Sequence, residues 1–348
     1  MQVKWPPCTA HPATGSKTHI QIRFLENLDD ILIFTPYYKS VIWGGNRIAT
    51  LKGEAIDVPR LGESWELSAV PGCESVVCQG PHTGCTLSEM CRRFGSALLG
   101  DKVHAKFGNE FPILVKILDA CDKLSLQVHP DDNVASHHAG HTVRGKNELW
   151  YVLSSTADSR IYSGLAQELT PHEYETRVAD HSIMQAVASH PSLPGQFYFI
   201  PAGTIHTCTA GNLIAEIQES SDVTYRIYDF NRRDKDSNLR QLHTTLAREA
   251  INFTYPNPVE PTARVYPLST RGVVVTPHFT TDLLKVHGQT AIQAEPGSFT
   301  VLMVTDGEVT VSTGRTSIRL TKGHTALIPA STQAYTITGT ATLLKVHC

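Results

Sequence analysis

The sequence predicts a mainly β protein that contains two related β-barrels and a few short helices. Apolar runs of strand length recur along most of the chain, whereas only a few segments have helical periodicity. The motif Gly195-x4-Ile-Pro-Ala returns as Gly323-x4-Ile-Pro-Ala, and each copy follows a predicted pair of strands. A repeated strand–turn–strand unit of this kind indicates two related barrels.

Length and composition define the class of protein. A chain of 348 residues is long enough for a substantial core and for two domains, and 41% hydrophobic residues is typical of a globular protein. The net charge of −3 indicates no nucleic-acid surface, and no apolar run approaches the length of a membrane span. Eight scattered cysteines without a CxxC pair, and no apolar signal segment near the start, predict reduced thiols and a cytoplasmic location.

The amino-terminal segment, residues 1–30, lacks sustained periodicity and is predicted to be a loose extension. Ordered structure is expected to begin with a short apolar strand at 31–34. Two further strands are expected at 63–68 and 75–78, because both segments are short apolar runs.

A single helix is predicted over residues 86–99. Thr86 and Glu89 have the spacing of a capping box, apolar residues follow at helical intervals, and Gly100 is placed to end the helix. The apolar stripe is interpreted as core. The helix belongs to a helical insertion expected near residues 86–110.

The next two strands contain the polar residues of most interest. Lys116 interrupts the apolar strand at 112–118, and its side chain either extends to solvent or faces a polar cavity; the local sequence leaves both open. In the following strand, Ser125, Gln127 and His129 share one face, because residues two apart point to the same side. The alternative is an ordinary half-exposed strand with its polar residues turned outward.

Histidines 137, 138 and 141 lie between glycines and are expected in a solvated loop. A strand is predicted at 148–153. A helix is predicted to begin after Thr170, since a proline and a glutamate follow it at the first and third helical positions.

The pattern Gly195-x5-Pro-x-Gly-x2-His206 predicts a tight bend that turns the imidazole into the mouth of a barrel. Strands at 213–218 and 224–230 and a short helix ending near Ile251 are expected to follow.

A proline-punctuated linker divides a first domain, 31–255, from a second domain, 256–348. Asp306-Gly307 predicts a hairpin turn in the second domain. Ala334 stands where the first copy of the repeat has its histidine, so the second domain is not expected to bind metal in the same way.

Four side chains of the first domain form a candidate metal site. They are two imidazoles, one carboxylate and one amide, from His129, His206, Glu148 and Gln127. This set of nitrogen and oxygen ligands suits Zn²⁺ or another first-row divalent ion, with an open position for substrate. The glycine–proline–histidine pattern resembles the second signature of the cupin family.

Longer stretches resemble type I mannose-6-phosphate isomerases of the short bacterial form, within the cupin superfamily. They are Leu124-Ser-Leu-Gln-Val-His-Pro-Asp-Asp132, Gly145-Lys-Asn-Glu-Leu-Trp-Tyr-Val-Leu153, Ile200-Pro-Ala-Gly-Thr-Ile-His206 and Glu219-Ser-Ser-Asp-Val-Thr-Tyr-Arg-Ile-Tyr-Asp229. The resemblance implies two cupin-type (jelly-roll) β-barrel domains, the first catalytic and the second degenerate. It also implies one zinc ion per chain, bound by Gln127, His129, Glu148 and His206.

The same resemblance implies roles for the residues that line the pocket in this family. Arg226 matches the arginine held to be catalytic, and Glu216 and Lys146 match pocket positions that could take part in catalysis. Substrate-binding roles are implied for Ser125, Lys116 and Trp43. For Lys116, the resemblance therefore favours the cavity over solvent.

A member of this family is expected to be a zinc-dependent aldose–ketose isomerase that interconverts mannose 6-phosphate and fructose 6-phosphate through a cis-enediol. The reaction needs a base. Glu216 is favoured over Lys146, because a carboxylate among lysines stays ionised whereas a lysine needs a lowered pKa, but the sequence does not decide between them.

Two alternatives are another metal-dependent cupin sugar-phosphate isomerase and a catalytically silent sugar-binding cupin, although the latter would be expected to lose Arg226 or a metal ligand. The expected partner is a small sugar phosphate, without nucleic acid or membrane. The chain is expected to be a monomer or a weak homodimer.

Overall fold

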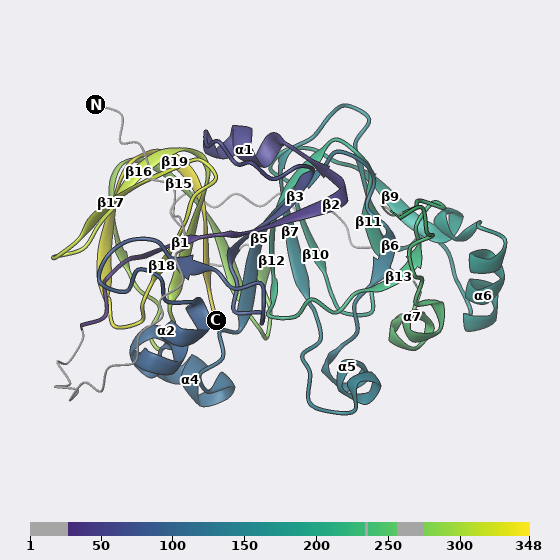
Figure 1. Ribbon diagram of the computed structural model, residues 1–348, viewed down its shortest axis with the longest axis horizontal. Helices are drawn as coiled ribbons and strands as arrows, with labels where there is room; N and C mark the ends of the chain where they lie inside the picture. The colour runs from purple at the N-terminus through teal and green to yellow at the C-terminus, as the bar shows by residue number, and fades with distance from the viewer. Residues whose placement is uncertain (1–26, 234–235, 256–273) are drawn as a thin grey trace.

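The computed structural model describes residues 27–233, 236–255 and 274–348, and this part of the chain is mainly β, as predicted. Two lobes lie side by side, and the carboxyl-terminal strands, yellow in Figure 1, build most of one of them. The described strands form three open sheets arranged in jelly-roll fashion rather than closed barrels.

The first lobe consists of a six-stranded and a five-stranded sheet. The larger sheet runs in the order β10 (Phe197–Ile200), β7 (Glu148–Ser154), β12 (Asn212–Glu219), β5 (Ile113–Ala120), β3 (Leu61–Leu67) and β2 (Tyr37–Gly45). The smaller sheet runs β13 (Tyr225–Tyr228), β6 (Leu126–Val128), β11 (His206–Cys208), β8 (Arg160–Leu165) and β9 (Val187–Pro191). Every residue of β5 and β12 is buried, so polar side chains on these strands lie inside the lobe.

The second lobe is an eight-stranded sheet dominated by three long strands. Its order is β14 (Val274–Val275), β15 (Thr280–Gln293), β19 (Ala334–His347), β16 (Thr300–Ser312), β18 (Thr325–Ile328), β1 (Leu32–Thr35) and β4 (Val76–Val77), with β17 (Ser317–Thr321) paired to β16. Strands β1 and β4 come from the amino-terminal part of the chain but complete this sheet. The segment 31–255 therefore contributes strands to both lobes.

The predicted hairpin turn at Asp306-Gly307 is wrong. Strand β16 continues through this dipeptide, and its pairing with β19 shifts register between Val304 and Asp306, which is a β-bulge. Gly307 has φ +77°, and a Cβ there would lie 2.2 Å from the carbonyl oxygen of Thr340. An Asp-Gly pair favours positive φ in a bulge as well as in a turn, so the local signal could not separate them.

The repeated motif forms the same unit in both lobes. Gly195 precedes β10 and Gly323 precedes β18, each with positive φ, and the strand after the bend is β11 in one lobe and β19 in the other. His206 begins β11 and Ala334 begins β19. The absence of metal binding in the second lobe stays a prediction from this replacement.

The helical insertion differs from the predicted single helix over 86–99. The capping box of Thr86 and Glu89 is present, but Gly95, at φ 48° and ψ −124°, ends α2 (Leu87–Phe94) and starts α3 (Ser96–Leu99). After Gly100 the chain continues as α4 (Asp101–Phe107). Backbone hydrogen bonds then attach the insertion to the second lobe, including Phe299 N–H to the Leu99 carbonyl at 3.2 Å.

The remaining described helices are α1 (Arg47–Lys52), α5 (Asp132–Ala139), α6 (Pro171–Ala179), the 3₁₀ helix η1 (Ile183–Ala186) and α7 (Thr244–Ala250). Helix α6 has the N-terminal cap predicted at Thr170. The expected loop around the histidines is wrong for His137 and His138, because Asp131 caps a helix that contains both. None of the described helices combines the length and the apolarity needed to cross a membrane.

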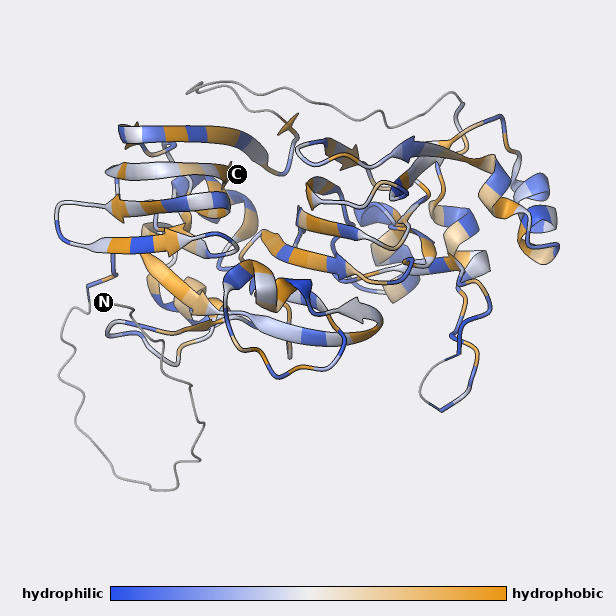
Figure 2. Cartoon of the chain, turned by 90° about the horizontal axis from the view of Figure 1, so that it is seen from above, coloured by the Kyte–Doolittle hydropathy of each residue, from blue (hydrophilic) through white to orange (hydrophobic). Residues whose placement is uncertain are grey.

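One apolar core continues from the first lobe into the second. Val115 and Ile117 of β5 belong to the same buried cluster as Met303 and Leu344 of the second lobe. Figure 2 shows apolar residues, in orange, along the strands of both lobes. The sheet that carries β5 is thus held against the second lobe by burial of apolar surface.

The predicted domain limits meet residues that the structure does not describe. The limit between 255 and 256 adjoins the undescribed segment 256–273, and of the predicted extension only residues 27–30 are described. The division into domains stays a prediction. Strands β1 and β4 lie in the predicted first domain by sequence but belong to the sheet of the second lobe.

Gly100→Ala is expected to lower the free energy of unfolding by about 3 kcal/mol or more. Gly100 has φ +89°, and a Cβ there would lie 2.2 Å from the backbone carbon of Gly297, so the insertion could not stay in place. The control is Gly53→Ala, at φ +66° with no atom within 4 Å, which should cost only about 1 kcal/mol. Urea unfolding followed by circular dichroism measures both, and equal losses would contradict this account.

Candidate functional site

The predicted metal ligands come from three strands that meet inside the first lobe. Gln127 of β6 pairs directly with His206 of β11, His129 follows β6, and Glu148 begins β7. The N–H of Gly203 donates to the carbonyl of His129 at 2.8 Å, which joins the bend before β11 to the end of β6. The glycine–proline bend therefore brings the second imidazole next to the first.

Three of these side chains form a compact and fully buried cluster. Possible ligand atoms of His129, Glu148 and His206 all lie within 4.8 Å of one another. Nε2 of His206 is 3.0 Å from Oε1 of Glu148, and Nε2 of His129 is 3.3 Å from Oε2. None of the three residues is more than 1% exposed.

The hydrogen bonds on the far side of each imidazole define which nitrogen carries a proton. Nδ1 of His129 donates to the carbonyl of Val223 at 2.8 Å, and Nδ1 of His206 donates to the carbonyl of Thr204 at 2.9 Å. In neutral rings, both Nε2 atoms then present lone pairs toward the Glu148 carboxylate. Backbone carbonyls commonly orient metal-binding histidines in this way.

The buried carboxylate supports the interpretation as a metal site. Among the described residues, no donor makes a hydrogen bond of acceptable geometry to either oxygen of Glu148. Two imidazole lone pairs and two carboxylate oxygens facing each other are stabilised by a cation between them. The amide nitrogen of Gln127 lies 3.1 Å from Nε2 of His206, and a half-turn of the amide would present its oxygen instead. These residues fit a zinc ion by ligand type.

The charges around the cluster favour the protonation states that bind metal. Burial, together with the charge of Lys146, lowers the pKa of His129 to about 3, so this imidazole is neutral. Burial alone would raise the pKa of Glu148, but Lys146 and the two imidazoles lower it well below its usual range. The cluster therefore presents an ionised carboxylate at Glu148 and a neutral imidazole at His129.

Lys146 connects this cluster to a row of alternating charges. Its Nζ lies 2.7 Å from Oε2 of Glu148 and 3.5 Å from Oε1 of Glu216. Burial alone would lower the pKa of Lys146, but the two carboxylates raise it above its usual value. Lys116 continues the row, with Nζ 3.3 Å from Glu216 and 3.7 Å from Glu63.

Strand register explains this row. Glu216 of β12 pairs with Lys116 of β5 on one side and with Trp150 of β7 on the other. Paired residues face the same side of a sheet, so the three side chains meet. The Trp150 indole N–H donates to Oε2 of Glu216 at 3.0 Å, and Lys116 lies over the ring of Trp65 at 4.7 Å.

A cavity of about 310 Å³ lies in front of the charged row. Among the predicted residues, its lining includes Trp43, Lys116, Ser125, Gln127, Lys146, Glu216 and Arg226. Glu148, His129 and His206 are not in the lining and are fully buried. Lys116 faces this cavity and does not extend to solvent. The structure thus brings together all ten residues that the sequence placed in the site.

Arg226 is positioned by the segment that precedes α7. Its Nη1 donates to the carbonyl of Gln241 at 2.7 Å, and its backbone N–H donates to Nδ1 of His243 at 3.1 Å. The buried Nε makes no hydrogen bond within the described residues. Burial and the like charge of Arg240 lower the pKa of Arg226 from its usual value.

Four charged residues of the cavity wall were missed by the sequence analysis, namely Lys39, Glu63, Asp222 and Arg240. The sequence could have indicated Glu63, because it lies two residues before Trp65 on one strand and therefore faces the same side. Its carboxylate accepts a hydrogen bond from the Trp65 indole N–H at 2.7 Å. Arg240 had no such indication, because it lies in a polar segment without periodicity and reaches the cavity only through the fold.

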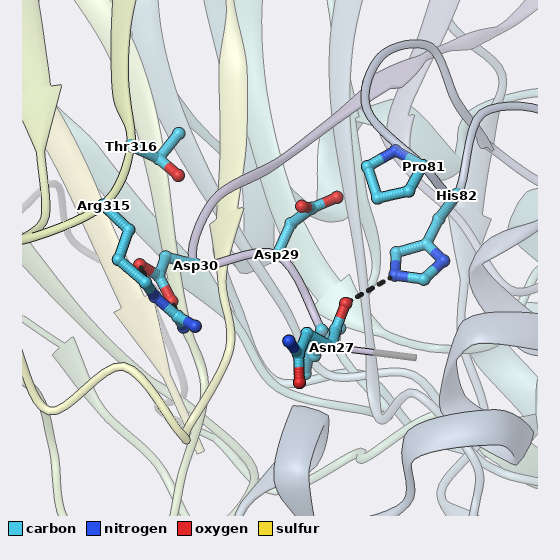
Figure 3. A pocket seen from close by; sticks show the side chains of 8 residues that line it. Asn27, Asp29, Asp30, Pro81, His82, Arg315 and Thr316 are labelled. Atoms are coloured by element: carbon cyan, nitrogen blue, oxygen red, sulfur yellow. Dashed lines mark hydrogen bonds and ion pairs between the residues drawn. The ribbon is translucent and has the colours of Figure 1, made fainter. Parts of the chain in front are cut away.

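A second cavity, also about 310 Å³, lies beside the second lobe and contains none of the predicted site residues (Figure 3). His82 bonds the carbonyl of Asn27 at 3.1 Å there, and the carboxylate of Asp30 is paired with Arg315. The charges that line this cavity are thus largely engaged with each other.

Comparison with known proteins agrees with this geometry. The family model of the phosphomannose isomerase type I catalytic domain matches residues 31–166, and that of the mannose-6-phosphate isomerase cupin domain matches residues 270–348. The chain is 32% identical to a mannose-6-phosphate isomerase of Streptococcus mutans, over 88% of this chain and 94% of that protein. It is also 32% identical to mannose-6-phosphate isomerase ManA of Bacillus subtilis, over 91% and 98%.

Solved structures of other proteins share this fold. The crystal structure of the mannose 6-phosphate isomerase from Bacillus subtilis aligns with a TM-score of 0.82 at 29% identity, covering 92% of this chain and 100% of that one. A phosphomannose isomerase from Salmonella typhimurium aligns with a TM-score of 0.74 at 17% identity, covering 92% and 99%. At this lower identity the likeness shows a shared fold.

Purified metal-free protein is expected to bind one zinc ion, and Glu148→Gln should weaken binding by more than about 100-fold, because the carboxylate supplies the only negative charge among the four ligands. Glu249→Gln is the matched control, since Glu249 also contacts a histidine, His138, at 2.6 Å but lies outside the site. Isothermal titration calorimetry with zinc measures both. Equal affinities for wild type and Glu148→Gln would contradict the assignment.

Proposed function

This chain belongs to the type I phosphomannose isomerase family, and we propose that it is a zinc-dependent enzyme that interconverts mannose 6-phosphate and fructose 6-phosphate. The observation that carries the proposal is the buried Glu148 carboxylate, faced by the Nε2 atoms of His129 and His206 directly behind a cavity rich in cationic side chains. A sugar phosphate is the expected ligand of such a cavity.

The zinc ion would be held by Gln127, His129, Glu148 and His206. When bound there, it supplies Lewis-acid polarisation of a sugar oxygen. The carbonyls of Val223 and Thr204 keep the two imidazoles in the tautomer that leaves Nε2 unprotonated. Burial of these groups excludes water from the ligand atoms.

The isomerisation moves a proton between C2 and C1 of the sugar through a cis-enediol. Glu216 is the proposed base. The Trp150 N–H and the Lys116 ammonium orient its carboxylate from two sides, and a carboxylate needs no deprotonation before it can accept a proton. Arg226, which lines the cavity, would stabilise the negative charge that develops on the enediolate oxygens.

Lys146 is the rival base and is assigned a different role here. Its ammonium lies between the carboxylates of Glu148 and Glu216, and both contacts favour the protonated form. In this position it would donate hydrogen bonds to sugar oxygens rather than accept a proton. Ser125, Lys116 and Trp43 are proposed substrate contacts because all three line the cavity. Cytoplasmic location and a monomeric or weakly dimeric state stay predictions from the sequence.

The zinc-loaded protein is expected to convert mannose 6-phosphate to fructose 6-phosphate in an assay coupled to fructose 6-phosphate consumption. Treatment with a chelator should reduce turnover at least ~100-fold, and added zinc should restore it. Without the metal, the sugar oxygen is no longer polarised. A chelator already saturated with zinc is the control. No conversion under zinc-replete conditions would reject the proposal.

Glu216→Gln is expected to reduce turnover by about 10²- to 10⁴-fold and to stop the loss of deuterium from C2-deuterated substrate, since glutamine cannot accept the proton. Lys146→Gln should lower turnover yet keep measurable exchange. Exchange is followed by proton NMR in water. Exchange that persists in Glu216→Gln but vanishes in Lys146→Gln would assign the base to the lysine.

A further inference from the structure

Asn147 lies between Lys146 and the metal ligand Glu148, and every polar group of this asparagine has a partner. Its backbone N–H and its Nδ2 donate to Oε2 of Glu219 at 2.9 and 2.5 Å. Its backbone carbonyl accepts the N–H of Glu219 at 3.1 Å. Its Oδ1 accepts the N–H of Ala202 at 3.0 Å. Glu219 and Ala202 together therefore hold Asn147 in one position.

The contact with Ala202 joins two parts of the metal centre. Ala202 lies in the glycine–proline bend that leads to His206, and Asn147 directly precedes Glu148. The imidazole of His206 and the carboxylate of Glu148 meet at 3.0 Å. One asparagine side chain thus links the strand that supplies the carboxylate to the bend that supplies an imidazole.

Glu219, the last residue of β12, orients Asn147 and is only 2% exposed. Burial alone would raise the pKa of Glu219, but hydrogen bonds with His278 and Asn147 lower it, so the carboxylate is ionised. Nδ1 of His278 lies 2.7 Å from Oε1, the oxygen that Asn147 does not contact. The two carboxylate oxygens are therefore divided between Asn147 and His278.

His278 belongs to the second lobe and lies in a fixed turn. The N–H of Thr276 donates to the carbonyl of Phe279 at 3.0 Å, and the N–H of Phe279 donates to Oγ1 of Thr276 at 2.9 Å. Phe279 is buried in the apolar core that both lobes share. Nζ of Lys106, in α4, donates to the carbonyl of Pro277 at 2.9 Å. The second lobe and the helical insertion together fix the position of this imidazole.

We propose that Glu219 is a positioning residue of the metal centre, and that through it His278 of the second lobe raises the affinity of the first lobe for zinc. This inference rests on the proposed function, because it concerns the metal of that enzyme. His278 holds the carboxylate of Glu219, and Glu219 holds Asn147. Asn147 in turn holds the start of β7 against the bend before His206. Without these contacts the ligand atoms would occupy more positions, and zinc binding would have to restrict them at a cost in conformational entropy.

Glu219→Ala is expected to weaken zinc binding by about 10- to 100-fold, because Asn147 loses the acceptor of two hydrogen bonds. Glu219→Gln should recover part of this loss, since its amide oxygen can still accept from Asn147. His278→Ala should weaken binding by about 10-fold or less, because the contacts with Asn147 remain. Isothermal titration calorimetry of the metal-free full chain with zinc measures each variant, and thermal melting checks that each is folded.

The route through Glu219 has its own test. His278→Ala should weaken zinc binding in the wild-type background and have no further effect in Glu219→Ala. The matched control is His324→Ala, because His324 also lies in the second lobe and contacts a carboxylate, that of Glu54, at 2.9 Å. Glu54 belongs neither to the cavity wall nor to the metal cluster. The control variant should therefore lose stability but keep its zinc affinity.

Unchanged zinc affinity in folded Glu219→Ala would overturn the inference, and so would equal losses of affinity in His278→Ala and His324→Ala. An effect of His278→Ala that is equally large in both backgrounds would overturn the route through Glu219. Should Glu219→Ala fail to fold, unchanged affinity in His278→Ala would overturn the inference in its place. Calorimetry does not depend on isomerase activity. Zinc binding that needs Glu219 and His278, in a protein that does not convert mannose 6-phosphate, would reject the proposed activity and support this inference.

Discussion

Glu148 places a negative charge in the interior of the first lobe, where both of its oxygens face unprotonated imidazole nitrogens at 3.0 and 3.3 Å. Burying a carboxylate without compensation is costly, so the surrounding structure has to stabilise it. Lys146 supplies one positive charge at 2.7 Å. A cation bound among the three residues would supply the other compensation and remove the repulsion among the lone pairs. The buried charge of Glu148 thus accounts for why a cation would be stabilised at this cluster.

The second lobe supports this centre at a distance. His278, which precedes β15, contacts Oε1 of Glu219 at 2.7 Å, and Oε2 of Glu219 accepts the backbone N–H of Asn147 at 2.9 Å. Asn147 lies between Lys146 and Glu148, so the second lobe helps to hold the start of β7 in place. The shared apolar core does the same for β5, which carries Lys116. The second lobe, which has Ala334 in place of the histidine, therefore contributes to the site by holding β5 and the start of β7 in place.

The charged row and two arginines line one cavity. Along the row, lysines and carboxylates alternate, so this part of the wall carries little net charge. Arg226 and Arg240 add positive charge to the wall of the same cavity. This difference follows from register, because β12 carries Glu216 opposite Lys116 whereas β13 carries Arg226 opposite Gln127.

Local sequence was sufficient for features that depend on neighbours along the chain. These include the alternation that gives Gln127 and His129 one face, the capping boxes at Thr86 and Thr170, and the bend before His206. It failed where one local signal fits two structures, as for Gly307 in a bulge and His138 in a helix. Tertiary structure alone decided that β1 joins the second lobe and that Arg240 lines the same cavity as Arg226. These contacts join residues far apart in sequence, and their geometry depends on strand pairing and burial, which no local pattern encodes.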